Sequence, residues 1–283
     1  RFTHWRPYFH RVVAMVDGNQ IPLPFNLNSL DMLFPPRHAE RLSEKAIQVY
    51  GFGAKVPILR LMESEDKELR FLGEYIYEKI FEGYTTKQWG VGPKQLDPSV
   101  TARVPFCVSR DNRYFQDTYQ AIPRPGYASL FQRMLSHPNI AVLLKVDYRE
   151  VVEEVRFSRM VYTGPIDEFF DYMHGPLPYR SIRFVFETVK QEFCQEVATV
   201  NYPNNFDFTR ITEQKYLTGQ RSDHTTLVVE YPEACKPHEN EPYYPIPRSE
   251  NQERYALYAK EAGKLKTVLF AGRLADYRYY NMD

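Results

Sequence analysis

The sequence has few cysteines and no long apolar run. Its 3 cysteines, Cys107, Cys194 and Cys235, are widely spaced and form no Cys-x-x-Cys pair. An odd, scattered set argues against a disulfide framework and a zinc site and is typical of a reducing compartment. No apolar stretch is long enough to cross a membrane, and no signal-peptide pattern is visible. These absences predict a cytoplasmic protein.

The sequence also lacks net charge. It carries 36 basic and 36 acidic residues, so nothing indicates nonspecific binding to nucleic acid or to a membrane surface. No Ser-His-Asp set, paired-carboxylate motif or metal-ligand cluster is recognisable, and His10, His137 and His224 have no catalytic context. We therefore expect no metal site and no hydrolytic route carried by the side chains alone.

A glycine-rich dinucleotide-binding turn is missing as well. Gly51-Phe52-Gly53 has Val56 where a third glycine belongs, and Gly90-Val91-Gly92 runs directly into Pro93. Neither has the Gly-x-Gly-x-x-Gly spacing that brings a backbone turn close to a pyrophosphate.

Aromatic residues, in contrast, are abundant. They make up 15% of the chain, with 22 tyrosines, most of which we assign to the core and the sheet. The segment Tyr84-Thr85-Thr86-Lys87-Gln88-Trp89 follows a helical pattern and is itself followed by Arg103. Such aromatic and amide side chains can stack on and hydrogen-bond a flat polar ring, and the arginine can bind its phosphates. The segment predicts half of a nucleotide pocket.

The periodicity predicts an α+β fold. Residues 12–23 alternate around Asp17-Gly18-Asn19 and predict a β-hairpin. Two helical stripes follow, one of Ala39, Leu42, Ala46 and Val49 and one of Leu69, Leu72, Ile76 and Ile80, with Ser64 as the expected cap of the second. We divide the chain into a hairpin segment (1–29), a helical subdomain (30–95) and an antiparallel-sheet region (96–283).

Further elements are predicted from residue 126 onward. Helices are expected over 126–137 and 253–265, and Pro232 to Asn251 is expected to be a surface loop apart from the Tyr243-Tyr244 motif within it. Strands are expected over 142–146, 151–155, 157–163, 182–186, 196–202 and 225–231, and a buried strand over 268–272.

Several motifs together resemble the UDP-galactopyranose mutase family. Besides the segment at Tyr84, they are Tyr162-Thr163-Gly164-Pro165-Ile166-Asp167, Tyr179-Arg180-Ser181, Thr209-Arg210-Ile211, Glu241-Pro242-Tyr243-Tyr244-Pro245 and Gly272-Arg273-Leu274 with Tyr277-Arg278-Tyr279-Tyr280. The resemblance implies that the family's N-terminal FAD-binding, Rossmann-like core is largely absent from this chain, as is its C-terminal helix. We therefore expect a fragment of such an enzyme, inactive by itself.

The resemblance implies a role for individual residues. Arg103 and Arg210 match the arginines that grip the UDP diphosphate during catalysis. Phe81, Tyr84, Thr85, Trp89 and Asn201 match the uridine end, Tyr114, Tyr244 and Tyr279 surround the diphosphate and galactose, and Arg180 is another pocket arginine. Arg273, Asn281 and Met282 would contact FAD, although Asn281 replaces the family's usual aspartate and so accepts a hydrogen bond without charge.

The implied reaction interconverts UDP-galactopyranose and UDP-galactofuranose with reduced FAD and no net redox change. The residues of this chain would hold UDP while the flavin acts as nucleophile at the sugar, which is positional catalysis. The expected ligands are those two UDP-sugars, and a homodimer is a further candidate assembly. Two alternatives stay open: a non-catalytic UDP-sugar-binding module or scaffold, and an amine-oxidase-like flavoenzyme. The latter needs no diphosphate clamp.

Overall fold

The computed structural model describes residues 2–96 and 104–280. The chain divides into two compact units. The terminal unit takes residues 1–6, 121–179 and 235–283, and the sheet unit takes residues 7–120 and 180–234. Each is described here by itself.

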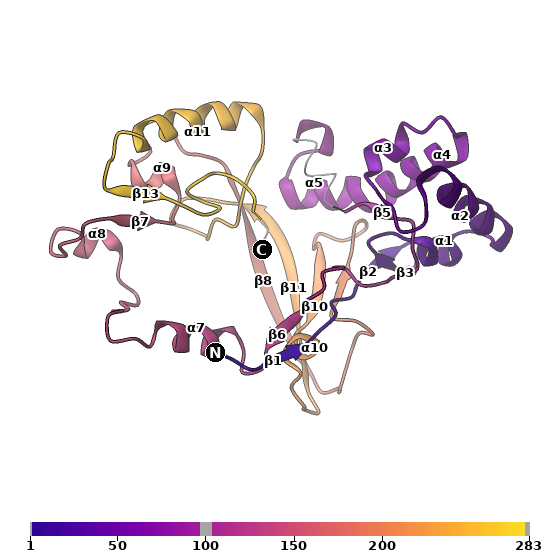
Figure 1. Cartoon of the computed structure of the whole chain (residues 1–283), viewed down its shortest axis with the longest axis horizontal. Helices are drawn as coiled ribbons and strands as arrows, with labels where there is room; N and C mark the ends of the chain where they lie inside the picture. Colours follow the sequence, from indigo (N-terminus) through magenta and orange to yellow (C-terminus); the bar gives the residue numbers. More distant parts are fainter. Residues whose placement is uncertain (1, 97–103, 281–283) are drawn as a thin grey trace. The chain divides into compact units, whose positions relative to one another are not determined.

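Strands of the sheet unit run in the order β8-β11-β10-β9-β2-β3 (Figure 1). Their bounds are β2 (Val12–Val16), β3 (Asn19–Leu23), β8 (Tyr179–Val189), β9 (Thr199–Asn201), β10 (Arg210–Glu213) and β11 (Thr225–Ala234). Neighbours in this order are antiparallel except for β2 and β9, which run parallel. The predicted mixed α+β class with a multi-stranded sheet is confirmed, and the parallel pair is a feature that the predicted antiparallel pattern missed.

The predicted hairpin is confirmed by β2 and β3, which pair from Val12 with Leu23 to Val16 with Asn19. The connecting residues Asp17 and Gly18 have φ of 48° and 83°. Positive φ at both central positions suits the right-handed twist of the strands, which is why Asp-Gly is favoured there.

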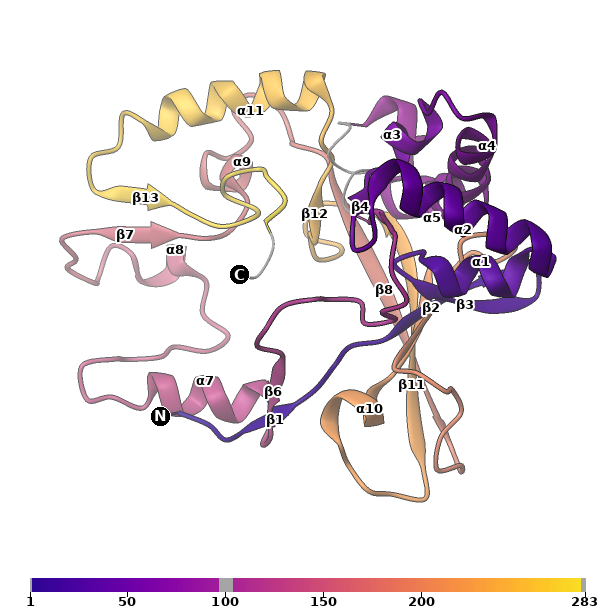
Figure 2. The same ribbon diagram turned by 45° about the vertical axis from the view of Figure 1, so that its right-hand side comes forward.

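A group of helices runs from residue 27 to residue 95, and the Tyr84 segment is part of it. Figures 1 and 2 show these helices beside the β2–β3 hairpin. Their bounds are α1 (Leu27–Leu33), α2 (Pro36–Tyr50), α3 (Ile58–Met62), α4 (Lys67–Ile76), the π-helical turn η1 (Tyr77–Glu82), α5 (Gly83–Trp89) and the 3₁₀ turn η2 (Pro93–Gln95). The unit also holds α10 (Gln214–Thr218) and the short paired strands β4 (Lys55–Val56) and β5 (Phe106–Cys107).

Both helical stripes bury their apolar residues in one core, with one exception. Leu69, Leu72 and Ile76 are fully buried, whereas Val49 is 54% exposed because it lies in the last turn of α2. Each fully buried leucine or isoleucine contributes roughly 1.5–3 kcal/mol to folding. The helical stripes therefore supply much of the stability of this unit.

The predicted cap of the second stripe is wrong. Asp66, not Ser64, accepts hydrogen bonds from the backbone N–H groups of Glu68 and Leu69 at 2.8 and 3.1 Å. Helix α3 ends at Met62, and the backbone N–H of Ser64 closes the turn after it. Asp66 is therefore the residue in position to satisfy the first N–H groups of α4.

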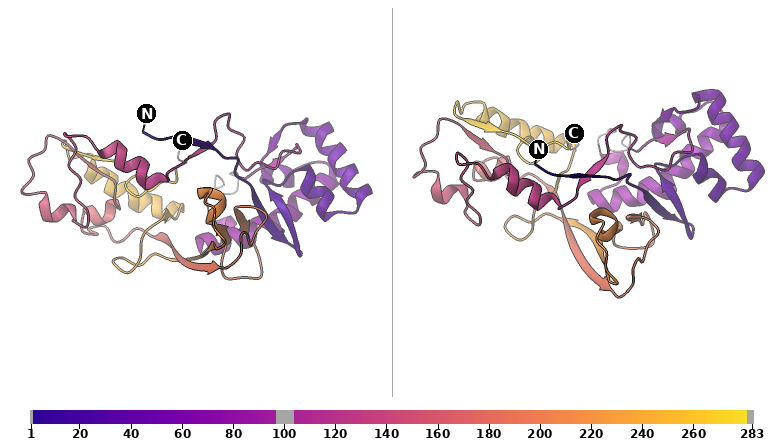
Figure 3. Two further views of the ribbon diagram at one scale, coloured as in Figure 1. Left: turned by 90° about the horizontal axis from the view of Figure 1, so that it is seen from below. Right: turned by 60° about the horizontal axis from the view of Figure 1, so that its bottom comes forward.

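The terminal unit is built around two short parallel strands. β7 (Met160–Tyr162) pairs with β13 (Val268–Phe270), as Figure 2 shows. The other elements are β1 (Trp5–Pro7), β6 (Ala121–Pro123), α7 (Tyr127–Leu135), α8 (Tyr148–Val151), α9 (Ile166–Phe169), β12 (Tyr244–Pro245) and α11 (Ser249–Ala262). Buried tyrosines dominate its small core, since Tyr258 and Tyr277 are 0% and 1% exposed. Figure 3 shows α11 as the long yellow helix of this unit.

Several predictions in this unit need correction. Residues 142–146 form no strand, and the region expected as a strand over 151–155 begins with the end of helix α8. Asp147 and Glu150 form a reciprocal capping box that favours a helical turn there. Leu144 is 79% exposed, so its apolar character reflects no packing against a neighbouring strand in the described chain.

Other predictions in this unit hold with shifted bounds. The strand over 157–163 corresponds to the shorter β7, and the helices over 126–137 and 253–265 correspond to α7 and α11. The strand over 268–272 forms as β13 but is not buried, since Leu269 is 53% exposed. The loop expected over 232–251 contains the end of β11, all of β12 and the start of α11.

Candidate functional site

The Tyr84 segment is itself a helix. It forms α5, so the expectation that it follows the helical region is corrected. Thr85, Gln88 and Trp89 are 6–7% exposed and Tyr84 is half-buried, while Phe81 in the preceding turn η1 is 8% exposed and joins the helical core. The aromatic and polar side chains predicted for the uridine end are therefore held by a packed helix and not by a loop.

Arg180 holds the C-terminal end of α5. Its Nε donates to the main-chain oxygen of Gln88 at 2.9 Å and a terminal nitrogen donates to that of Lys87 at 3.1 Å. These are the carbonyls that a helix end leaves without partners, and a cation there also complements the helix dipole. Burial lowers the pKa of Arg180. The predicted pocket arginine thus fixes the predicted uridine helix.

Asn201 and Arg210 lie directly opposite each other on β9 and β10. The Nε of Arg210 forms an ion pair with Glu230 Oε2 on β11 at 2.8 Å. Burial raises the pKa of Glu230, and the neighbouring guanidinium of Arg210 partly opposes that rise. Asn201, predicted for the uridine end, and Arg210, predicted for the diphosphate, are therefore neighbours in the sheet.

Two buried amide oxygens in this unit accept no hydrogen bond from any residue that the structure describes. They are Gln88 Oε1 on α5 and Asn201 Oδ1 on β9. A buried acceptor without a donor costs about 1–3 kcal/mol. Such oxygens are suited to a ligand that brings N–H or O–H groups. The sequence predicted that the amide of Gln88 hydrogen-bonds a flat polar ring, and no role was predicted for it in the resemblance to the family.

Tyr114 lies next to His10. Its backbone N–H donates to the main-chain oxygen of His10 at 2.8 Å, and the two rings meet edge to face at 5.9 Å. The hydroxyl of Tyr8 is 3.1 Å from His10 Nδ1. Burial and the charge of Arg210 lower the pKa of His10 to about 4, so its imidazole is neutral at pH 7. The sequence could not indicate that His10 is held neutral beside Arg210, because the two residues are 200 positions apart.

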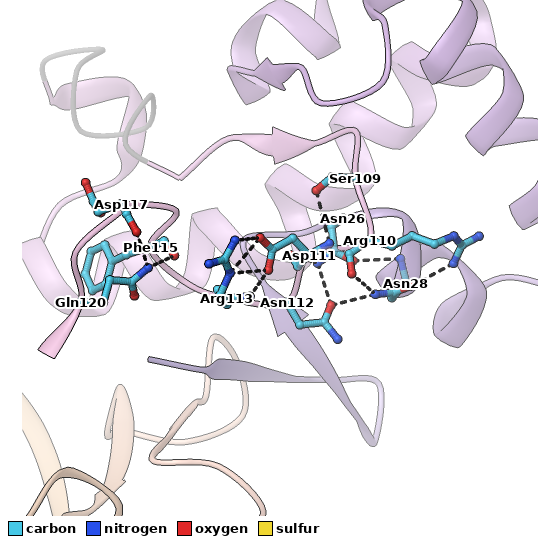
Figure 4. A network of polar contacts seen from close by, with 10 residues as sticks. All are labelled: Asn26, Asn28, Ser109, Arg110, Asp111, Asn112, Arg113, Phe115, Asp117 and Gln120. Atoms are coloured by element: carbon cyan, nitrogen blue, oxygen red, sulfur yellow. Dashed lines mark hydrogen bonds and ion pairs between the residues drawn. The ribbon is translucent and has the colours of Figure 1, made fainter. Parts of the chain in front are cut away.

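A network of amides holds the segment that carries Tyr114 (Figure 4). Asn112 Oδ1 accepts from the side-chain amides of Asn26 at 3.0 Å and Asn28 at 2.9 Å. Asn26 also caps α1 and donates to the main-chain oxygen of Asp111 at 3.2 Å. One oxygen therefore joins the start of α1 to the segment 110–115, and the sequence analysis assigned no role to it.

Tyr244, Tyr279 and Arg273 form a second cluster, in the terminal unit. The two tyrosine rings stack at 5.7 Å with an interplanar angle of 22°. The guanidinium carbon of Arg273 lies 4.2 Å from the ring centre of Tyr279 and 5.6 Å from that of Tyr244. An arginine held over an aromatic ring gains about 0.5–2 kcal/mol from the contact.

The remaining predicted residues, Arg103, Asn281 and Met282, lie outside the described residues. Within the described ranges, no group of His, Cys, Asp and Glu side chains is arranged to hold a metal ion. No helix in the same ranges is long and apolar enough to span a membrane.

Known proteins resemble this chain over its whole length. The UDP-galactopyranose mutase family profile matches residues 79–279. A probable UDP-galactopyranose mutase of Klebsiella pneumoniae is 34% identical over all of this chain and 73% of its own length. A dTDP-fucopyranose mutase of Escherichia coli is 33% identical over all of this chain and 76% of its own length.

Among solved structures, a reduced UDP-galactopyranose mutase matches with a TM-score of 0.61 and 15% identity. The match covers 97% of this chain and 75% of that one. At that identity the likeness establishes the shared fold.

Proposed function

This chain belongs to the UDP-galactopyranose mutase family, and from that premise we propose that it binds a UDP-sugar for the interconversion of UDP-galactopyranose and UDP-galactofuranose. The observation that carries the proposal is the pair of buried acceptors, Gln88 Oε1 and Asn201 Oδ1, in the unit that also holds the predicted aromatic and arginine residues. The class of reaction is an isomerisation.

Uridine suits the α5 side of the sheet unit. Uracil offers an N–H donor and a flat ring, and ribose offers hydroxyl donors. We assign these groups to the amide oxygens of Gln88 and Asn201 and to the rings of Tyr84 and Trp89. Phe81 and Thr85 are buried and lie near Tyr84 in the sequence, and they complete the predicted uridine end.

The diphosphate is assigned to Arg210, with Arg103 as the second arginine. Arg180 is assigned to the same pocket as a further arginine. A guanidinium carries five N–H donors, so pairing of Arg210 Nε with Glu230 is compatible with binding of phosphate oxygens through the terminal nitrogens. Tyr114 is assigned to the diphosphate and sugar, beside the neutral His10. These groups hold UDP in place and return it to the sugar, which is catalysis by position and charge.

The cofactor is proposed to be FAD. Arg273 fits such a group, because its guanidinium is held in place over the ring of Tyr279 and near that of Tyr244, two tyrosines that keep the substrate role implied by the resemblance. Asn281 and Met282 are proposed as further contacts. When bound in its reduced form, FAD supplies the nucleophile that the reaction needs at the sugar. The side chains of this chain contribute binding and orientation of the UDP-sugar.

A deoxysugar nucleotide is the second candidate substrate. The dTDP-fucopyranose mutase of Escherichia coli is nearly as similar to this chain as the Klebsiella protein. The two substrates differ at the base methyl, the ribose 2′-hydroxyl and the sugar 6-hydroxyl. Parallel titrations with UDP and dTDP distinguish them, because a site built for the ribose 2′-hydroxyl loses a hydrogen bond to the deoxyribose.

Isothermal titration of UDP into the 283-residue chain tests the proposal. We expect saturable binding of UDP, weaker binding of UMP because it lacks the second phosphate, and loss of UDP affinity in Arg210→Ala. A folded chain that binds no UDP and no dTDP contradicts the proposal. Visible flavin absorbance after incubation with FAD tests the cofactor assignment separately, with Arg273→Ala as the variant.

A further inference from the structure

One face of the η1–α5 helix contacts the loop of residues 202–209. The side-chain amide of Asn204 donates to the main-chain oxygen of Lys79 at 2.9 Å. Four residues on, a Cβ atom added to Gly83 would lie 2.2 Å from Asn204 Oδ1 and 2.6 Å from the main-chain oxygen of Pro203. Only a glycine permits this approach.

Another four residues on, Lys87 continues the same row. Its Nζ donates to the main-chain oxygens of Phe206 at 3.0 Å and Phe208 at 2.9 Å and to that of Tyr202. An ammonium group has three N–H donors, so these three carbonyls use all of them. Lys87 thereby closes the loop around its own side chain.

The loop that Lys87 holds is the connection between β9 and β10. The last residue of β9 is Asn201 and the first of β10 is Arg210, and these two are direct partners across the strands. Because the loop joins them, its conformation sets the separation and the direction of both residues. The helix at its other side carries Tyr84 and Trp89.

We propose that Lys87 is a positioning residue that couples the two halves of the nucleotide site. Through three main-chain hydrogen bonds, it fixes the loop joining Asn201 to Arg210 against the helix that carries Tyr84 and Trp89. The inference rests on the proposed function, since it assumes that these residues bind UDP. It adds a residue that contacts no substrate but determines how tightly UDP is held.

The chemistry of Lys87 supports a specific role. Arg180 donates to the main-chain oxygen of Lys87 itself, so the same helical turn is held from β8 and from the β9–β10 loop. Burial lowers the pKa of Lys87 to about 8, against the opposing charge of Asp207. Methionine has a similar length but no N–H donors, so it cannot bridge the three carbonyls that Lys87 holds.

Titration of UDP into three variants of the 283-residue chain provides the test. We expect Lys87→Met to weaken UDP binding about tenfold, the loss typical of hydrogen bonds to a charged group. Gly83→Ala should give a similar loss, although alanine favours a helix, because its methyl group displaces the loop without touching Lys87. The matched control is Lys79→Met on the same helix, whose Nζ pairs with Asp17 at 3.1 Å and not with the loop.

A double-mutant cycle separates positioning from general loss of stability. In an Asn201→Ala background, Lys87→Met should have a smaller effect on UDP affinity than it has alone, because one of the two residues that the loop positions is gone. Lys87→Arg should restore part of the affinity. Circular dichroism checks that each variant is folded, and if Lys87→Met is not, Gly83→Ala carries the same cycle.

The outcomes are distinguishable. Absence of UDP binding by the unaltered chain overturns the proposed function and this inference with it. Binding by the unaltered chain that Lys87→Met and Gly83→Ala leave within about twofold overturns the inference alone. Equal losses from Lys87→Met with and without Asn201 also overturn it, since they show that Lys87 does not act through that residue.

Discussion

Arg210 and Glu230 are partners in two ways: they occupy opposite positions on β10 and β11, and their side chains form an ion pair at 2.8 Å. The side chains are 31% and 14% exposed, so water screens the pair only in part. The arginine proposed for the diphosphate is therefore also the partner of a mostly buried carboxylate. Substitution of either residue should change stability as well as binding.

Arg210→Met should destabilise the protein at pH 7 by about 1–3 kcal/mol, because it leaves Glu230 without its cation. Burial already raises the pKa of Glu230, and loss of Arg210 raises it further. A raised carboxyl pKa gives stability that is present below the unfolded pKa and is lost as pH rises through the folded pKa. The destabilisation by Arg210→Met should therefore be smaller at pH 4.5 than at pH 7.

Urea denaturation at both pH values measures this effect. The control is Arg210→Met combined with Glu230→Gln, which removes the buried charge and should reduce the pH difference to the part that His10 contributes through its contact with the charge of Arg210. If the single variant is equally destabilised at both pH values, Glu230 is not the group responsible.

Gly90, which caps the C-terminal end of α5, has a backbone conformation that disfavours a side chain. It ends the helix at φ 71°, and a Cβ there would lie 2.9 Å from a terminal nitrogen of Arg180. Gly90→Ala should lower the free energy of unfolding by about 1–2 kcal/mol, through strain at positive φ and displacement of Arg180. Gly92→Ala is the matched control, because nothing lies within 4 Å of its added methyl group. Comparable losses in both variants would contradict the assigned role of Arg180.

Local features of this fold could be predicted from the sequence. Asp17-Gly18 specified the hairpin, because few other residue pairs adopt positive φ at both positions. The period of Leu69, Leu72 and Ile76 predicted a buried helical face, and these residues are fully buried. In each case the physical cause lies within a few residues of chain.

Contacts between distant segments could not be predicted in this way. The hydrogen bond from Arg180 to the main-chain oxygen of Gln88 joins residues 92 positions apart. Neither local sequence indicates that a main-chain oxygen is the acceptor. Strand β10 went unrecognised because it has four residues and directly follows an aromatic-rich loop. The apolar residues around Leu144 showed the opposite error, since a strand-like pattern forms a strand only when another strand pairs with it.

Asn112→Ala should destabilise the segment that carries Tyr114. The substitution removes the oxygen that accepts from both Asn26 and Asn28, so each amide keeps only a main-chain acceptor, and Asn26 is fully buried. A buried amide N–H left without its acceptor costs about 1–3 kcal/mol. Asn112→Asp keeps an acceptor oxygen and should retain most of the stability in thermal denaturation at pH 7. Equal melting temperatures for the alanine variant and the unaltered chain would contradict this role.

Protonation of His10 should set part of the acid limit of stability. Burial and the charge of Arg210 lower its pKa from 6.5 to about 4, so the folded protein binds the proton less readily than the unfolded chain. A lowered histidine pKa gives stability that is present above the unfolded value and is lost as pH falls through the folded value. The shift corresponds to about 3 kcal/mol, lost between pH 6.5 and 4.

His10→Gln should therefore reduce the loss of stability over this range in urea denaturation, while His137→Gln, at an exposed position, should leave it unchanged. The comparison isolates His10 from the carboxylates that also titrate there, because those are the same in all three proteins. A pH profile that His10→Gln does not alter would show that His10 is not held neutral against Arg210.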